Sequence, residues 1–287
     1  MIDHPLESLQ SWVAYLSQVE IPVLRRTERE LARLRENEDS VSGREIAQVV
    51  LQDPLMAVRV LAYIEAHRRR SQNADITTID RAIMMLGITP FFRNFAQLTL
   101  VETHLGAHPK ALLGLLQVVA RARRAAHFAR DWALVRHDLD VDEITVAALL
   151  RDITEILLWC FAPKLALEVA ELKAKKPSMR SHVAHGAVYG IDLRDLQMAL
   201  CQAWRLPELL TTLMSEAHVN SPRVRNVLLA DDLARHAANG WNDPALPDDF
   251  RAVADLLHMT PDAVMMRLGV DSYTVEEREK LNRNSAD

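Results

Sequence analysis

Two clusters of arginines are the groups in this sequence best suited to holding an anion. The first cluster follows His67 and consists of Arg68, Arg69 and Arg70. The second consists of Arg121, Arg123 and Arg124. Guanidinium groups bind phosphates and carboxylates through paired hydrogen bonds, so both clusters are candidates for contact with a nucleotide or with an acidic protein surface. The alternative for the first cluster is that its cations only complement the dipole of the helix they terminate.

Histidines and cysteines offer the other chemistry. His182 and His185 stand three residues apart near an expected helix start, a spacing that can hold a metal ion. No third ligand stands nearby, so we interpret them as a solvent-facing pair and expect no metal there. Cys160 and Cys201 lie in apolar helical contexts and are expected to be buried, reduced thiols. No Gly-rich phosphate loop, nucleophile elbow or kinase signature occurs, so we predict no cofactor.

The composition predicts a globular, helical protein. Of 287 residues, 49% are hydrophobic, 25% are charged and only 8 are glycine, which favours helices over sheets. The formal net charge of −5 does not suggest the basic face that nucleic acid requires, so we do not expect DNA binding. No apolar run is long enough to span a bilayer, and Met1–Pro5 does not begin a signal peptide. We therefore expect a cytoplasmic protein with no membrane partner.

Capping signals mark where several helices begin and end. Ser42–Glu45 forms a capping box, in which the serine and glutamate side chains satisfy each other's backbone amides. Asp53 precedes Pro54 as an N-cap residue does, so a second helix is expected to start there. Thr77–Asp80 is interpreted as another capping box, opening a helix that ends at Gly87.

Apolar periodicity predicts helices along most of the remaining chain and no convincing strand. The expected helices span about 89–104, 111–135, 142–161, 163–174, 192–204, 207–218, 221–239, 248–258, 261–268 and 274–283. Residues 106–110 and 240–249 are interpreted as boundaries. The chain should then divide into an N-terminal helix (1–20), an N-terminal lobe (21–105), a helical bundle (106–240) and a C-terminal helical extension (241–287).

Two motifs in the N-terminal lobe follow one another in a definite order. Asp53-Pro-Leu-Met-Ala-Val-Arg-Val-Leu61 is followed by Ala82-Ile-Met-Met-Leu-Gly87, and Ile21-Pro22 precedes both. Together they resemble the N-terminal part of HDOD domains, which are non-catalytic relatives of the HD and HD-GYP metal-dependent phosphohydrolases.

The second half of the chain resembles the HD-derived bundle of the same family. Ala148–Leu157 is similar to the helix that carries the His-Asp pair of HD enzymes, and Trp204–Pro207 is similar to the step before the last core helices. The resemblance covers roughly 21–240. It implies an all-α, HD-like bundle with an N-terminal lobe, in a bacterial signalling protein.

The resemblance also implies positions for metal ligands, and most of them are lost. The histidine of the His-Asp pair is replaced by Arg151, whose guanidinium cannot ligate a metal, while Asp152 is retained. His218 and Asp231 stand where further ligands are expected, but Leu193 replaces another histidine. An HD hydrolase needs several converging ligands to activate water. We therefore predict a degenerate site with no bound metal and no catalysis.

The retained groups are expected to be satisfied by hydrogen bonds. For Asp152 the expected donor is Arg124 or another arginine on a facing helix, because a partly buried carboxylate needs one. The segment Met259–Asp271 faintly resembles a helix-turn-helix, but it lacks a basic recognition face, so a C-terminal helical cap is the preferred interpretation.

Three functions remain to be distinguished. The first is a signal-transduction output or adaptor module that binds other signalling proteins, as the resemblance implies. The second is a divergent phosphohydrolase or cyclic-dinucleotide phosphodiesterase with a rebuilt metal site. The third is a transcription regulator that uses the C-terminal segment. The sequence identifies neither the partner nor the oligomeric state.

Overall fold

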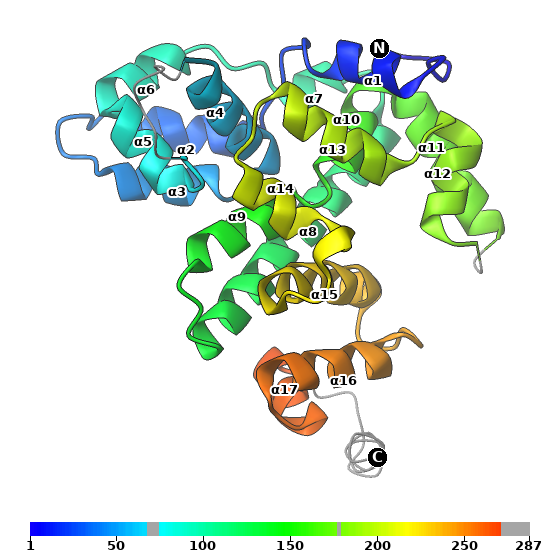
Figure 1. Ribbon diagram of the computed structural model, residues 1–287. Coiled ribbons are helices and arrows are strands. Elements are labelled where there is room, and N and C mark those ends of the chain that lie inside the picture. Colours follow the sequence, from blue (N-terminus) through cyan, green and yellow to red (C-terminus); the bar gives the residue numbers. More distant parts are fainter. Residues whose placement is uncertain (68–74, 177–178, 271–287) are drawn as a thin grey trace. The chain divides into compact units, whose positions relative to one another are not determined.

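The computed structural model describes residues 1–67, 75–176 and 179–270, and these residues form an all-α structure (Figure 1). The all-α expectation is confirmed. The chain forms two compact units: residues 1–120 with 152–211, and residues 121–151 with the chain from Thr212 onward. The domain limits expected from the sequence follow family modules rather than packing, and they stay a prediction.

The N-terminal part of the first unit is a cluster of short helices. Its helices are α1 (Leu9–Leu16), α2 (Arg25–Arg35), α3 (Gly43–Val50), α4 (Pro54–His67), α5 (Ile79–Leu86), α6 (Ile88–Asn94) and α7 (Val101–His104). Helix α3 packs against α2, α4 and α5, and α4 packs against α5 (Figure 1). The capping box of Ser42 and Glu45 is present, and α5 ends at Gly87, whose φ of 84° suits a residue without a β-carbon.

A buried aspartate holds the start of α4 against the start of α2. One carboxylate oxygen of Asp53 accepts hydrogen bonds from the amide of Leu24 (2.8 Å) and the hydroxyl of Thr27 (2.9 Å). The other accepts from the amides of Leu55 (3.0 Å) and Met56 (3.3 Å). The residue expected as a helix cap therefore also joins two helices. The four donors account for a carboxylate that is fully buried.

The rest of the first unit is built from the helices that follow in the chain, up to residue 211. They are the first part of α8 (Pro109–Val135), α10 (Ile153–Phe161), α11 (Pro163–Lys175), α12 (Ser181–Tyr189) and α13 (Leu193–Ala203). Helix α10 is almost entirely buried and packs against α4, α11 and α13, while α1 packs against α13.

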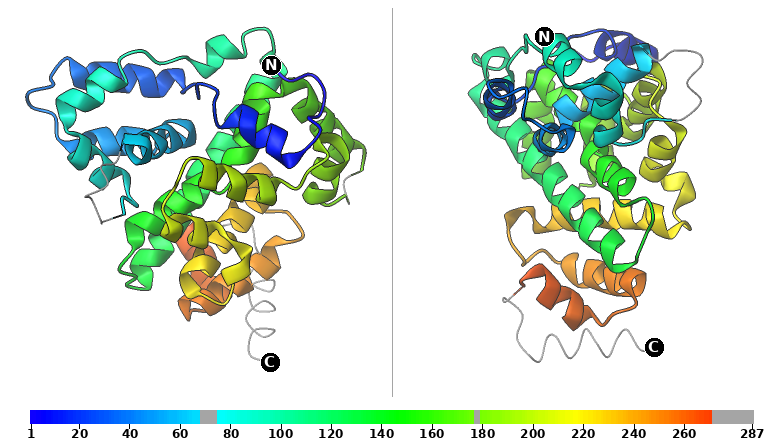
Figure 2. Two further views of the ribbon diagram at one scale, coloured as in Figure 1. Left: turned by 45° about the horizontal axis from the view of Figure 1, so that its top comes forward. Right: turned by 90° about the vertical axis from the view of Figure 1, so that its left-hand side faces the viewer.

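The second unit contains the remainder of α8 and the last helices of the described chain. They are α9 (Val141–Leu150), α14 (Glu208–Met214, which begins in the first unit), α15 (Pro222–His236), α16 (Leu246–Leu257) and α17 (Pro261–Leu268), with 3₁₀ turns at Glu216–His218 and Ala237–Asn239. Helix α15 packs against α9 on one side and α16 on another, and α17 packs on α16 (Figure 2). The expected helix at 274–283 lies outside the described residues.

Several predictions about helix limits are wrong. The expected helix at 142–161 is broken, because Arg151 and Asp152 form a turn and Asp152 leaves the helical region, with φ −102° and ψ 17°. The expected helix at 89–104 stops at Asn94. The chain then pairs with the segment before α2 in a parallel bridge between Val23 and Leu100, which a continuous helix would not allow.

The third correction concerns the start of α5. The capping side chain is that of Thr78, whose hydroxyl accepts a hydrogen bond from the amide of Arg81. Thr77 was expected in this role, but α5 begins one residue later than that placement requires.

Candidate functional site

The second unit contains a buried arginine, Arg151. Arg151 is only 4% exposed. Its Nη1 donates a hydrogen bond to the carbonyl of Met214, and its Nη2 donates to Oε1 of Glu216 at 2.6 Å. Its Nε lies 3.8 Å from Oδ2 of Asp231. Residues 214–216 and Asp231, all more than 60 positions after Arg151, thus supply oxygens to one guanidinium, with sequence separations of 63 and 65 for the two hydrogen bonds. We call these four residues the Arg151 cluster.

Local structure explains why these groups meet. Arg151 follows the last turn of α9, and Asp231 lies on α15, the helix that packs against α9. Glu216 is held in a 3₁₀ turn in which the amide of Ala217 donates a hydrogen bond to the hydroxyl of Ser215. The residues after α14 are therefore bent toward the end of α9 rather than continuing as the expected helix 207–218.

The electrostatics of the cluster are those of a compensated buried charge. The side chain of Asp231 is 6% exposed and that of Glu216 is 64% exposed. Removing a charge from water is costly unless an opposite charge and hydrogen bonds replace the lost hydration. Arg151 and Asp231 therefore compensate each other's buried charge, whereas Glu216 remains largely solvated. Arg151 gives Asp231 an ion pair at 3.8 Å, and the expectation that hydrogen bonds satisfy Asp231 stays a prediction.

The other two residues of the predicted site, Asp152 and His218, differ in burial. Asp152 is the first residue of the other unit's second segment, and it is buried (8% exposed) at the start of α10. His218 is exposed on the 3₁₀ turn. Its role as a hydrogen-bonded remnant of the site stays a prediction. The sequence missed Glu216. Its only signal was a carboxylate two residues before the histidine that the family resemblance singled out.

In the second arginine cluster, Arg124 makes contacts within the protein. Arg124 donates to the carbonyl of Ala237 at 2.7 Å, and its guanidinium lies over the rings of Trp241 (4.8 Å) and Phe128 (5.4 Å). The side chain of Arg124 is engaged by the turn after α15, and the expectation that Arg124 or another arginine is the donor to Asp152 stays a prediction.

The remaining arginines divide into two groups. Arg121 and Arg123 are half-buried, and neither is free of partners. The first cluster, Arg68, Arg69 and Arg70, lies outside the described residues.

The histidine pair is not the solvent-facing pair that the sequence predicts. His182 is exposed, but His185 is half-buried beside Tyr189, with ring centroids 6.0 Å apart. Burial lowers the pKa of His185, and the negative charges of Glu155 and Asp152 partly oppose that effect. The prediction failed because residues four apart on a helix share a face, so His185 follows Tyr189 into the unit.

Both cysteines are buried and free, as predicted. Burial raises the pKa of the Cys160 thiol and of the Cys201 thiol to about 12. Each therefore remains a protonated, unreactive thiol near neutral pH.

The described residues form an all-α protein in which α9 ends in a buried turn at Arg151 and Asp152. The HDOD domain profile matches residues 21–220, and the chain belongs to the HDOD domain family. No curated protein matches the chain.

Solved structures share the fold at low sequence identity. The MmoQ response regulator of Methylococcus capsulatus is 20% identical, with a TM-score of 0.61, over 83% of this chain and 98% of that one. A virulence factor of Campylobacter jejuni is 17% identical, with a TM-score of 0.63, over 98% of both chains. In the part of the chain that the structure describes, no helix is long and apolar enough to cross a membrane.

Proposed function

We propose that this protein is a non-catalytic signal-transduction output or adaptor module, which binds other signalling proteins and retains a degenerate HD site. The Arg151 cluster carries the proposal. In this cluster the permanently charged guanidinium of Arg151 occupies the place of a metal ion, and Asp231 pairs with it.

The chemistry of the donor set supports this interpretation. A guanidinium carries a permanent positive charge and has no lone pair to offer a metal. Arg151 stands at the position where the family resemblance expects a histidine ligand, and it is paired with Asp231, a retained ligand position. Among the described residues, no group of three or more His, Cys, Asp or Glu side chains is placed to hold a metal ion. The residues present do not fit the metal of HD hydrolases.

The proposed role in signalling is supported by family membership and by the name of one structural neighbour. That neighbour is described as a response regulator, a protein of signal transduction. At 20% identity its likeness concerns the fold, and the role comes to this chain as part of the proposal. We further propose that the N-terminal lobe (21–105), the HD-like bundle (106–240) and the extension (241–287) are the modules of a cytoplasmic protein.

The DNA-binding alternative has little support in the C-terminal helices. Arg267, the basic residue in the last turn of α17, forms an ion pair with Asp131 through bonds of 2.5 Å. Helix α17 also packs on α16. These contacts support the role of a helical cap, which the sequence favoured over a recognition helix.

A phosphodiesterase assay tests the non-catalytic part of the proposal. The purified protein, supplied with Mn²⁺ or Fe²⁺, should hydrolyse bis-p-nitrophenyl phosphate no faster than buffer containing the same metal. The matched variant Asp231→Asn separates real turnover from contamination. Hydrolysis by the wild type that this variant abolishes would support the phosphohydrolase alternative instead.

The binding part of the proposal needs a partner of defined identity. Proteins captured from a bacterial lysate would be purified singly and titrated against the full-length chain by calorimetry. Saturable one-to-one binding to a signalling protein is the expected result. Capture only of chaperones, or of no protein that binds when pure, would contradict the adaptor role.

A further inference from the structure

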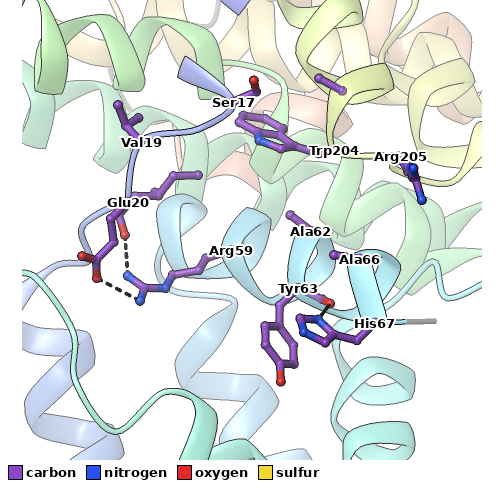
Figure 3. Close-up of a pocket in the computed structure, with 12 residues that line it drawn as sticks. Ser17, Val19, Glu20, Arg59, Ala62, Tyr63, Ala66, His67, Trp204 and Arg205 are labelled. Carbon is purple, nitrogen blue, oxygen red and sulfur yellow. Dashed lines mark hydrogen bonds and ion pairs between the residues drawn. The ribbon is translucent and has the colours of Figure 1, made fainter. Parts of the chain in front are cut away.

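An open groove of about 580 Å³ lies within the first unit (Figure 3). Three segments form it: residues 17–21 after α1, the last two turns of α4, and residues 203–205 at the end of α13. Its volume is in the range of pockets that hold small organic ligands. The described residues of the predicted HD site and of the second arginine cluster do not line it.

Aromatic rings and small side chains line the groove. The rings of Tyr63 and His67 stack with centroids 4.1 Å apart and planes at 25°. Trp204 faces the groove from the other side, and its side chain is mostly buried. Between them, Ala62 and Ala66 leave the surface of α4 low and flat (Figure 3). Flat aromatic and alanine surfaces of this kind suit a planar ring.

The two arginines of the groove differ in how they are engaged. Arg59 is neutralised, because it pairs with Glu20 at 3.1 Å and donates to the carbonyl of Ile21 at 2.7 Å. Arg205 is exposed, and among the residues that the structure describes its guanidinium has no hydrogen-bond or ionic partner. The groove therefore offers one uncompensated positive charge.

Two further details concern how the polar groups are held. Arg205 adopts a left-handed backbone, with φ of 56°, where a residue with a β-carbon is strained. The amide of Leu206 donates to the carbonyl of Cys201 at 2.9 Å and fixes this turn. Nδ1 of His67 lies 2.8 Å from the carbonyl of Tyr63, which can only accept, so Nδ1 carries the proton and Nε2 remains for a ligand.

We propose that this groove binds a small planar aromatic ring that carries an anionic group, of the size of a nucleoside monophosphate. The ring lies on the alanine surface of α4 between Trp204 and the Tyr63–His67 pair. The anionic group pairs with Arg205. This site is independent of the proposed adaptor function, and it would give the module a small-molecule input.

The test is calorimetric titration of the full-length protein with adenosine monophosphate, adenosine and inorganic phosphate as separate probes. Adenosine monophosphate should saturate the protein at millimolar concentration or below. Adenosine should bind about tenfold more weakly, because it lacks the charge-assisted bonds. Phosphate alone should not saturate over the same range, because it lacks the ring. Equal binding of adenosine and its monophosphate, or no binding of either, would overturn the proposal.

Substitutions tie the result to the groove. Arg205→Gly removes the guanidinium at a backbone position that glycine prefers, so the fold is retained. It should reduce the affinity for adenosine monophosphate about tenfold, to that for adenosine. Ala66→Leu, at an exposed position on α4, should abolish binding of both probes by filling the groove. Arg44→Ala, an exposed arginine of α3 outside the groove, is the matched control. Unchanged affinity in both Arg205→Gly and Ala66→Leu would overturn the assignment.

Discussion

At the scale of the residue, one substitution changes what a buried position can do. A histidine before Asp152 would offer a metal a lone pair, whereas Arg151 brings its own positive charge and five N–H donors. The guanidinium donates hydrogen bonds to a main-chain carbonyl and a solvated carboxylate, and it forms an ion pair with a buried carboxylate. Removing either Arg151 or Asp231 alone should therefore destabilise the fold, because the other charge stays buried. Replacing both by apolar residues of similar volume should not have this effect.

Arg151→Ala should lower the free energy of unfolding by about 3–5 kcal/mol, because it leaves Asp231 buried without its cation. Urea denaturation followed by circular dichroism measures the change. Glu216→Gln is the control at the solvated end of the cluster and should cost less than about 1 kcal/mol. In the double variant Arg151→Met with Asp231→Leu, most of the loss should be recovered. A loss of less than about 1 kcal/mol in Arg151→Ala would show that the pair does not hold this region together.

At the scale of the element, the sequence predicted those helix ends that depend on neighbouring residues. The capping box at Ser42, the cap at Asp53 and the helix end at Gly87 all depend on residues within one turn, and each is present. The break at Arg151–Asp152 depends on oxygens supplied from residues 214–231, which no pattern near residue 151 reveals. The extended stretch before Leu100 likewise depends on pairing with Val23, about 77 residues earlier.

Within the candidate site, some partners could be predicted from the sequence and others could not. Arg151 and Asp231 could be singled out from the sequence because the family resemblance fixed their positions. Glu216 could not, since its role comes from the 3₁₀ turn that follows α14. The Tyr63–His67 pair had a local signal, two rings four residues apart on one helix, but its groove is completed by residues 203–205.

Helix packing in the first unit can be tested at two glycines, where substitution by alanine should change stability in opposite directions. A β-carbon at Gly114 of α8 would lie 2.6 Å from the ring of Trp159, whereas one at Gly186 of α12 would meet nothing within 4 Å. Gly114→Ala should therefore destabilise the protein by about 1–3 kcal/mol through overpacking. Gly186→Ala should stabilise it by about 0.5–1 kcal/mol, because alanine favours a helix. Thermal or urea unfolding compares the two, and the same sign for both would contradict the packing of α8 on α10.

At the scale of the whole molecule, two histidines link stability to pH. Burial lowers the pKa of His104, although a bond to the carbonyl of Cys160 partly opposes it, and burial lowers the pKa of His185. The unfolded chain then binds protons that the folded chain does not, once the pH falls through about 6.5. Stability contributed by these groups is complete above that pH and is lost as the pH decreases toward their folded pKa values.

The melting temperature should therefore fall between pH 7.5 and pH 5.5, as differential scanning calorimetry in buffers of matched ionic strength would measure. Replacing both His104 and His185 with glutamine should flatten this dependence. His218→Gln, at an exposed position on the 3₁₀ turn, is the matched control and should leave the dependence in place. An equally steep dependence in the double variant would assign the effect to other groups.

The central claim is that the guanidinium of Arg151 takes the place of a metal ion in a non-catalytic HD-like bundle. The most direct test is elemental analysis of the untagged, full-length protein after dialysis against trace iron, manganese and zinc without chelator. We predict metal far below one equivalent per chain for each element. A content near one equivalent per chain, lost in the Asp231→Asn variant, would contradict the claim.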